Sequence, residues 1–208
     1  HSPGRANRNE VSDAGGVLIK WEPPAVVARL HPEAETQAII RRQIFEHQDW
    51  LEFVRGTFDE AAAAEHFARL SGRSVEETRA LIRATREALV PIDGTIELLD
   101  DLVAAGVHLY LLSNMPVSTF EYLQRRYPFF GHFKHHVISG AILLVKPEPA
   151  IYEHLVEKTG IVPGETVFID DLLKNIIAAR ECGLHAIQFR DAPSCRVELR
   201  TYLPDAGL

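Results

Sequence analysis

Three short apolar segments in the second half of this chain constrain its fold more than any other feature. They cover residues 107–113, 166–169 and 185–189, and each is rich in aliphatic or aromatic side chains. Apolar runs of this kind are typical of strands in a parallel sheet, because both faces of such a sheet are covered. We therefore expect these three segments to be buried parallel strands.

Helical patterns precede these segments or fill the intervals between them, and they end at glycine, the usual left-handed stop of a helix. They cover residues 95–105, 148–159 and 172–182, before Gly106, Gly160 and Gly183. Strands that alternate with helices form right-handed crossover units. The sequence therefore predicts an α/β fold with a doubly wound parallel sheet, in which ligands bind beyond the carboxyl ends of the strands.

Residues 23–90 differ from the rest, because they read as successive helices without an intervening strand. The helical patterns cover residues 33–46, 59–70 and 75–89. We expect these residues to form a helical cap domain that is inserted after the first strand. The α/β core domain would then consist of residues 9–22 and 91–208.

Composition narrows the class of protein. Of the 208 residues, 46% are apolar and 25% are charged, as in an ordinary globular protein. The net charge of −7 argues against a nucleic-acid partner. The longest apolar stretch, near residues 137–145, is too short and too interrupted to span a membrane. No secretory pattern is visible and only two cysteines are present, so we expect a cytoplasmic protein, and the sequence leaves a homodimer open.

Four short polar signatures occur in order along the chain, and we expect each of them at the end of a strand. They are Asp13-Ala14-Gly15-Gly16-Val17, Leu112-Ser113-Asn114, Val145-Lys146-Pro147 and Phe168-Ile169-Asp170-Asp171. Together they supply a carboxylate, a hydroxyl, an ammonium group and a carboxylate pair, which phosphoryl transfer through an aspartyl intermediate needs. The third signature is expected after a strand at residues 141–145.

The first three signatures each have a purely structural interpretation as well. Asp13 suits a turn before two glycines. Ser113 or Asn114 suits the N-cap of a following helix, and Lys146 suits a solvated surface position. These alternatives stay open for each signature taken alone.

The carboxylate pair is harder to explain by structure alone. One aspartate would suffice to cap the helix that follows, but Asp170 and Asp171 are adjacent and would repel each other at the end of a buried strand. A cation relieves this repulsion, and Mg²⁺ takes hard oxygen ligands of this type. Asn175 lies about one helical turn further on and is placed to orient the two acids.

In this order, the signatures resemble the motifs of the haloacid dehalogenase-like (HAD) hydrolase superfamily. The resemblance runs from about residue 11 to residue 189 and is closest to the branch with a small helical cap and a first motif of the form Asp-x-Gly-Gly-Val. That branch includes sugar-phosphate phosphatases. The chain is also similar to haloacid dehalogenases and to the phosphatase domain of some epoxide hydrolases.

The resemblance implies a role for each polar side chain. Asp13 would be the nucleophile, and Ser113, Asn114 and Lys146 would hold or orient the phosphoryl group. Mg²⁺ would be bound by Asp171, by Asp170 directly or through water, by Asp13 and by the Gly15 carbonyl.

Three further positions would contact the substrate. Gly15 and Gly16 would let the backbone approach it closely. Trp50 of the cap would cover it and exclude water, although a place in the cap core with Phe53 is the structural alternative.

Two features depart from the family pattern. Most phosphatases of the superfamily carry a second aspartate where this chain has Gly15, and that residue acts as general acid and base. Its absence implies slow turnover, a good leaving group or an acid from elsewhere, for which His47 and Asp49 of the cap are candidates. The second feature is the polarity of residues 7–12, which implies a short first strand.

The sequence therefore predicts a Mg²⁺-dependent phosphatase that acts on a small phosphorylated metabolite through an aspartyl phosphate. Two alternatives remain: a metal-independent haloacid dehalogenase, and a non-catalytic relic that binds a phosphorylated ligand. The cluster of His132, His135 and His136 lacks the partners of a zinc site and is expected on the surface or in a loop.

Overall fold

Five parallel strands form the central sheet of the computed structural model, which describes residues 8–208. They are β1 (Asn9–Ser12), β2 (His108–Ser113), β3 (His135–Ile138), β4 (Thr166–Asp170) and β5 (His185–Gln188), in the spatial order β3-β2-β1-β4-β5. The chain moves outward from β1 to β3 on one side and from β4 to β5 on the other. This confirms the doubly wound sheet and puts its switch point at the end of β1, between the two halves.

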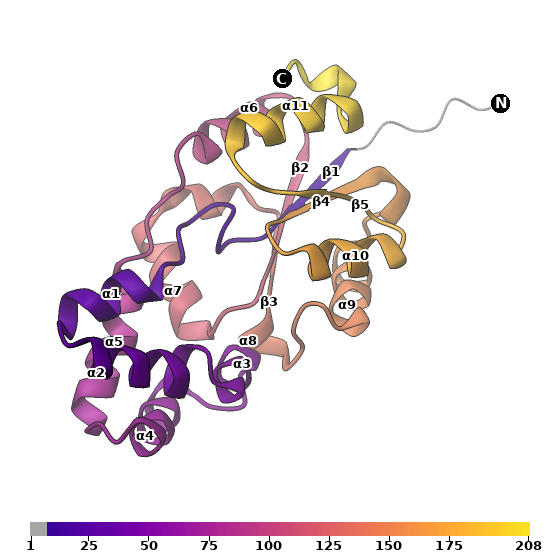
Figure 1. The fold of residues 1–208 in the computed structure, drawn as a ribbon. Helices are drawn as coiled ribbons and strands as arrows, with labels where there is room; N and C mark the ends of the chain where they lie inside the picture. Colours follow the sequence, from indigo (N-terminus) through magenta and orange to yellow (C-terminus); the bar gives the residue numbers. More distant parts are fainter. Residues whose placement is uncertain (1–7) are drawn as a thin grey trace.

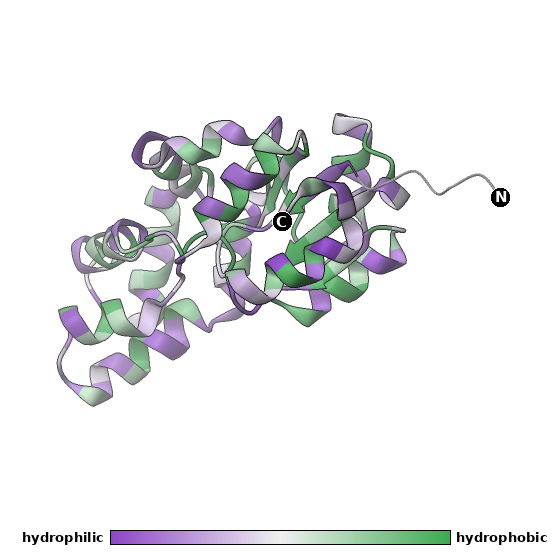
Figure 2. Cartoon of the chain, turned by 90° about the horizontal axis from the view of Figure 1, so that it is seen from above, coloured by the Kyte–Doolittle hydropathy of each residue, from purple (hydrophilic) through white to green (hydrophobic). Residues whose placement is uncertain are grey.

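Helices cover both faces of the sheet (Figure 1). One face packs on α6 (Thr95–Ala104), α7 (Val117–Arg126) and α11 (Ala192–Tyr202), and the other packs on α9 (Pro149–Thr159) and α10 (Leu173–Glu181). Leu109 and Leu111 of β2 point to the first face, and Tyr110 and Leu112 point to the second. The hydropathy colouring of Figure 2 shows apolar strands between helices that are purple on part of their surface.

The regular elements of the insertion between β1 and α6 are all helices. The insertion consists of α1 (Pro23–Leu30), α2 (Ala34–Ile40), a π-helical turn (Arg41–Phe45), α3 (Gln48–Arg55), α4 (Glu60–Ser71) and α5 (Val75–Glu87). Its apolar side chains form a cluster separate from the two sheet clusters, with Phe53 and Phe67 fully buried in it. This confirms a helical cap after the first strand. The helix expected at residues 33–46 is shorter, because the π-helical turn interrupts it.

The remaining elements are short. They are α8 (Ser139–Ile142) and three 3₁₀ turns (Pro128–His132, Pro163–Glu165 and Pro204–Ala206). Within residues 8–208, none of the helices combines the length and apolarity needed to cross a bilayer.

The strand expected at residues 141–145 is wrong. The edge strand β3 lies earlier, and the chain turns into α8 at Ser139. The Ser139 hydroxyl accepts a hydrogen bond from Met115 N (2.9 Å) and donates one to Val54 O (2.7 Å), so contacts distant in sequence end the strand. His135 and His136 therefore belong to a strand rather than a loop, and His136 Nε2 lies 3.1 Å from Phe130 O.

Although it is polar, β1 is the central strand. Residue 7 lies outside the described residues, but Asn9, Glu10 and Ser12 are all buried. Asn9 Nδ2 donates to Thr166 Oγ1 (3.3 Å), and Ser12 Oγ donates to Glu10 Oε1. Burial raises the pKa of Glu10 to about 8, since the Ser12 hydrogen bond offsets only part of the desolvation.

The cap contacts the core on two sides. On one side the two connecting segments pair with each other, with Lys20 N donating to Val90 O (2.8 Å) and Ile92 N to Leu18 O (2.9 Å). On the other side α3 ends at Gly56, where an added Cβ would collide with the Gly140 carbonyl.

Candidate active site

The polar signatures meet at the carboxyl ends of the central strands. Asp13 directly follows β1, Ser113 is the last residue of β2, and Asp170 is the last residue of β4. The location predicted for Lys146 is wrong, because this residue lies between α8 and α9 and not at the end of a strand. Its side chain nevertheless reaches the end of the sheet, so the fold brings all four signatures together.

Three donors fix the orientation of the Asp13 carboxylate. Asp13 Oδ1 accepts from Ala14 N (2.8 Å) and from Ser113 Oγ (3.3 Å), and it pairs with Lys146 Nζ (2.9 Å). All three contacts are to the same oxygen, which leaves Oδ2 outside this set. Ser113 is buried behind the carboxylate and, unlike Asp13, does not line the cavity described below.

Lys146 is buried and its ammonium group has three acceptors. Nζ lies 2.9 Å from Leu112 O, 2.9 Å from Asp13 Oδ1 and 2.7 Å from Asp170 Oδ2. These contacts match the three protons of the group. Asn114 positions the lysine, because its Oδ1 accepts from Lys146 N (2.8 Å) and its Nδ2 donates to Lys146 O (3.0 Å).

Three aspartates form the only cluster of at least three potential metal-ligating side chains within residues 8–208. Asp13, Asp170 and Asp171 each offer one carboxylate oxygen, and these oxygens all lie within 4.8 Å of one another. Asp170 is fully buried behind the others, where Oδ1 accepts from Leu172 N (2.9 Å). Asp171 lines the cavity, which favours it as the more direct ligand.

The electrostatics of this cluster favour an added cation. Burial raises the pKa of Asp13 to about 7; Lys146 opposes this shift, and Asp170 and Asp171 reinforce it. The pKa of Asp171 is also raised, by burial first and by Asp170 second. Burial acts to lower the pKa of Lys146, but Asp13 and Asp170 outweigh it and raise the pKa on balance. One ammonium group thus faces three carboxylates.

An unpartnered oxygen tests whether these residues suit Mg²⁺. Asn175 Nδ2 donates to both oxygens of Asp170 (3.2 and 3.1 Å), which orients the amide, and its Oδ1 is buried without a protein partner. A buried unsatisfied oxygen implies a missing water or ion. The three carboxylates of Asp13, Asp170 and Asp171 form a hard donor set, so the residues fit Mg²⁺.

The two glycines of the first signature have different surroundings. Gly16 has a positive φ of 83°, and an added Cβ would collide with the Asp171 carboxylate. Gly15 borders the cavity, and a Cβ there would meet only Trp21 Cβ, at an ordinary 3.8 Å. A lack of space for a side chain therefore explains why residue 16 is glycine, but it does not explain why residue 15 is glycine. The role of the Gly15 carbonyl as a metal ligand stays a prediction.

A cavity of about 370 Å³ opens in front of the aspartates, between the sheet and helices α3 and α5. Its wall includes Asp13, Asn114, Lys146 and Asp171 at the sheet end, and Trp50 on the cap side. Trp50 also packs on Phe53 in the cap core, with ring centroids 5.3 Å apart. Trp50 therefore borders the cavity, where it could cover a substrate, and also packs in the cap core.

The two cap candidates for the missing acid have other partners. His47 Nδ1 accepts from Asp49 N (3.0 Å) at the start of α3, and Asp49 Oδ2 lies 2.7 Å from His66 Nε2. Neither His47 nor Asp49 lines the cavity. Among the described residues, the cavity wall contains no histidine or glutamate that could replace the general acid.

Among the lining residues that the sequence does not single out are Trp21, Arg86 and Lys174. Trp21 lies in the segment that enters the cap, and its ring stacks on Trp50 with centroids 6.1 Å apart and an interplanar angle of 21°. Arg86 pairs with Glu60, and Lys174 is exposed at the start of α10. Trp21 and Arg86 belong to no motif, because the contact between cap and core brings them to the cavity, whereas Lys174 lies in the core, three residues after Asp171.

Comparison with known proteins agrees with this geometry. A family model for haloacid dehalogenase-like hydrolases matches residues 11–183. A sesquiterpene phosphatase of Aspergillus oryzae is 28% identical over 192 residues, which cover 91% of this chain and 93% of the relative. A D-ribitol-5-phosphate phosphatase of Bacteroides thetaiotaomicron is 24% identical over 208 residues, with coverages of 94% and 98%.

A solved structure shows the same fold. It is a HAD family enzyme from Bacteroides thetaiotaomicron in complex with magnesium and inorganic phosphate. The TM-score is 0.71 and the identity 23%, over 88% of this chain and 94% of that chain.

Proposed function

Since the chain belongs to the haloacid dehalogenase-like hydrolases, we propose that it is a Mg²⁺-dependent phosphatase that releases phosphate from a small phosphorylated metabolite. The observation that carries this proposal is the arrangement around Asp13. One of its oxygens is held by Ser113 and Lys146, Asp170 and Asp171 lie beside it, and Asp13 and Asp171 border a cavity.

In the first step Asp13 attacks phosphorus with its free oxygen, and an aspartyl phosphate forms as the alcohol leaves. The donors on Oδ1 keep Oδ2 directed away from Ser113 and Lys146, so the nucleophile needs little reorganisation. The ammonium group of Lys146 offsets the negative charge of the phosphoryl group. Water then hydrolyses the aspartyl phosphate.

The metal would be held by Asp13 and Asp171, with Asp170 behind them and the unpartnered Asn175 Oδ1 nearby. When bound, Mg²⁺ supplies positive charge that neutralises phosphoryl oxygens. Asn175 and Lys146 both hold Asp170 in place, so the chain orients this carboxylate from two sides.

Without an acid at position 15, protonation of the leaving oxygen has no obvious donor on the cavity wall. General acid catalysis contributes about a hundredfold or more in such reactions. We therefore expect slow turnover of unactivated esters and faster turnover of activated ones.

Hydrolysis of phosphate monoesters tests the proposal. We would measure phosphate release from a panel that includes acetyl phosphate, with Mg²⁺ and with EDTA, for the native chain and for Asp13→Asn. Asp205→Asn, in the C-terminal turn, is the matched control. Mg²⁺-dependent release that disappears in Asp13→Asn alone would support the proposal.

The contrary outcomes identify the alternatives. Halide release from 2-chloropropionate without metal, with no phosphate release, would show a dehalogenase, which uses the same nucleophile on carbon. Saturable phosphate binding without any turnover would show a ligand-binding relic.

A further inference from the structure

Beyond its charged end, the cavity wall is mainly apolar. The wall that would face a leaving group includes Ile19, Trp50, Phe53, Ile82, Leu89 and Met115. These side chains come from both cap and core, so the apolar surface surrounds the space and does not lie on one side only. A cavity of about 370 Å³ is within the range of small-molecule sites.

Most polar side chains on this wall already have partners. Thr85 Oγ1 donates to Ile82 O (2.7 Å), Arg86 pairs with Glu60, and Asn114 is engaged with the Lys146 backbone. Hydroxyl groups of a buried polyol would lose water and find few partners, which is unfavourable. A hydrocarbon group that packs on the same apolar surface binds favourably, because it is removed from water.

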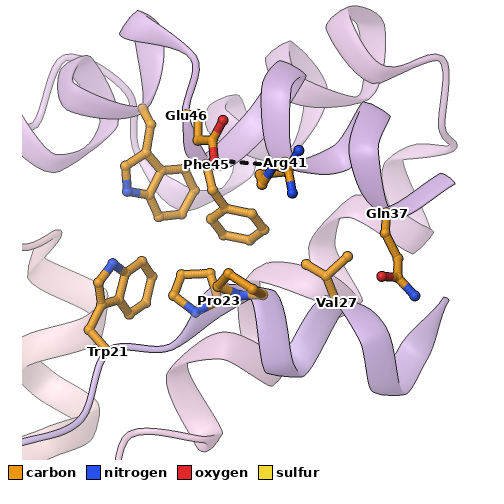
Figure 3. A pocket seen from close by; sticks show the side chains of 9 residues that line it. Trp21, Pro23, Val27, Gln37, Arg41, Phe45 and Glu46 are labelled. Atoms are coloured by element: carbon orange, nitrogen blue, oxygen red, sulfur yellow. Dashed lines mark ion pairs between the residues drawn. The ribbon is translucent and has the colours of Figure 1, made fainter. Parts of the chain in front are cut away.

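A second cavity lies beside the first, on the other side of Trp21 and Trp50 (Figure 3). It measures about 230 Å³ and is lined by Trp21, Pro23, Val27, Phe45 and Trp50, among others. Figure 3 shows Trp21 and Pro23 below Phe45, with the ion pair of Arg41 and Glu46 beside it.

The tryptophan pair belongs to both cavities. Trp21 and Trp50 line each of them, and their stacked rings form the partition. Trp21 is 42% exposed although its ring stacks on Trp50, so part of the pair stays accessible. A hydrocarbon chain that leaves the phosphate site toward the second cavity would meet this pair.

We propose that the substrate is a phosphate ester of an apolar alcohol, whose hydrocarbon part packs on Trp21 and Trp50 and, when long enough, extends into the second cavity. This inference rests on the proposed phosphatase function, because it places the phosphate at Asp13. It assigns Trp21 and Trp50 as residues that determine substrate specificity.

A chain-length series tests the inference. We would compare kcat/KM for butyl, hexyl and octyl phosphate with that for glycerol 3-phosphate and ribitol 5-phosphate, and use acetyl phosphate as a reference that needs no leaving-group pocket. We expect kcat/KM to rise by about fourfold for each buried methylene group. The polyol phosphates should fall below butyl phosphate.

Variants of Trp21 test whether the tryptophan pair causes the preference for long alkyl phosphates. In Trp21→Ala, the ratio of kcat/KM for octyl phosphate to that for acetyl phosphate should fall about tenfold, and Trp21→Phe should restore most of it. Val197→Ala, at an exposed site on α11, is the control and should leave the ratio unchanged.

Fluorescence gives a readout that does not depend on turnover. The chain has two tryptophans, Trp21 and Trp50, and both line the cavities. Octylphosphonate, which cannot be hydrolysed as an ester, should change their emission saturably, and methylphosphonate should do so much less. The change should persist in Trp21→Phe, which retains Trp50.

The outcomes separate the two claims. If acetyl phosphate is hydrolysed but kcat/KM is flat along the alkyl series or highest for a polyol phosphate, the apolar substrate class is wrong and the phosphatase function stands. If no ester is hydrolysed, acetyl phosphate included, the proposed function fails and this inference fails with it.

Discussion

The carboxylate of Asp171 occupies the space that a side chain on Gly16 would need. The absence of a side chain at Gly16 thus makes room for the Asp171 carboxylate, although the two residues belong to different signatures. The positive φ of Gly16 adds a backbone reason for the same residue.

Gly16→Ala should therefore lower both stability and Mg²⁺ affinity. The left-handed backbone alone should lower the free energy of unfolding by about 1 kcal/mol, and the displaced Asp171 should weaken the metal site. Gly72→Ala is the matched control, because Gly72 also has a positive φ but has no atoms near the added Cβ. Calorimetric titration with Mg²⁺ and chemical denaturation would check both effects; equal Mg²⁺ affinity in the two variants would contradict the prediction.

Gly15→Asp should increase phosphatase turnover. The position borders the cavity and has room for a side chain, so the new carboxyl could protonate the leaving oxygen. A gain of about tenfold or more in kcat for an unactivated ester is expected. Gly15→Asn has nearly the same size without the acidic proton, and a similar gain in that variant would rule out general acid catalysis as the cause.

Lys146→Met should abolish activity and increase the dependence of stability on Mg²⁺. Removing the ammonium group leaves Asp13 and Asp170 without their shared partner, and breaking a buried ion pair in this way costs about 3 to 5 kcal/mol. The added Mg²⁺ should raise the melting temperature of this variant more than that of the native chain. Lys158→Met, at an exposed position on α9, should behave like the native chain.

Mg²⁺ binding should weaken as the pH falls below about 7. Burial raises the pKa of Asp13 to about 7, and protons then compete with the metal for this carboxylate. The Mg²⁺-induced rise in melting temperature should accordingly be larger at pH 8 than at pH 6, when measured at one subsaturating concentration. A rise that is independent of pH would show that Asp13 does not bind the metal.

Glu10→Gln should stabilise the protein at alkaline pH. The pKa of Glu10 is raised from 4.5 to about 8 in the folded state, so the folded state retains a proton that the unfolded state loses. Stability from this group is full below pH 4.5 and declines as the pH rises to about 8. The variant should gain roughly 4 kcal/mol at pH 8 and roughly 1 kcal/mol or less at pH 5. Glu35→Gln, at an exposed site on α2, should show no such difference between the two pH values.

The sheet strands that are continuous apolar runs could be predicted from sequence, and so could several helices, among them α4 and α5. Asp59 and Ser74 begin α4 and α5 with side-chain hydrogen bonds, close to where the pattern predicts those helices. The residues 141–145 could not be assigned correctly, because a short apolar run does not distinguish a strand from other buried structure. Ser139 and its partners on Met115 and Val54 decide that region, and they are distant in sequence.

The candidate site divides in the same way. Asp13, Ser113, Lys146 and the adjacent acids carry local signatures that are visible in the sequence. Trp21 and Arg86 do not, since they reach the cavity only through the packing of cap on core. The polarity of β1 indicated a short strand, which is correct, but its position at the centre of the sheet follows from pairing with β2 and β4.

The contact of Gly56 with Gly140 has a consequence for how a substrate enters. It lies across the cavity from the paired connecting segments, and Arg55 adds an ion pair to Glu148 beside it (2.8 Å). Because the cap contacts the core at both sites, a hinge rotation of the cap about one contact would have to break the other. Entry of the substrate into the cavity should then depend on rotation of the exposed Trp21 side chain. This motion is far smaller and faster than a domain opening.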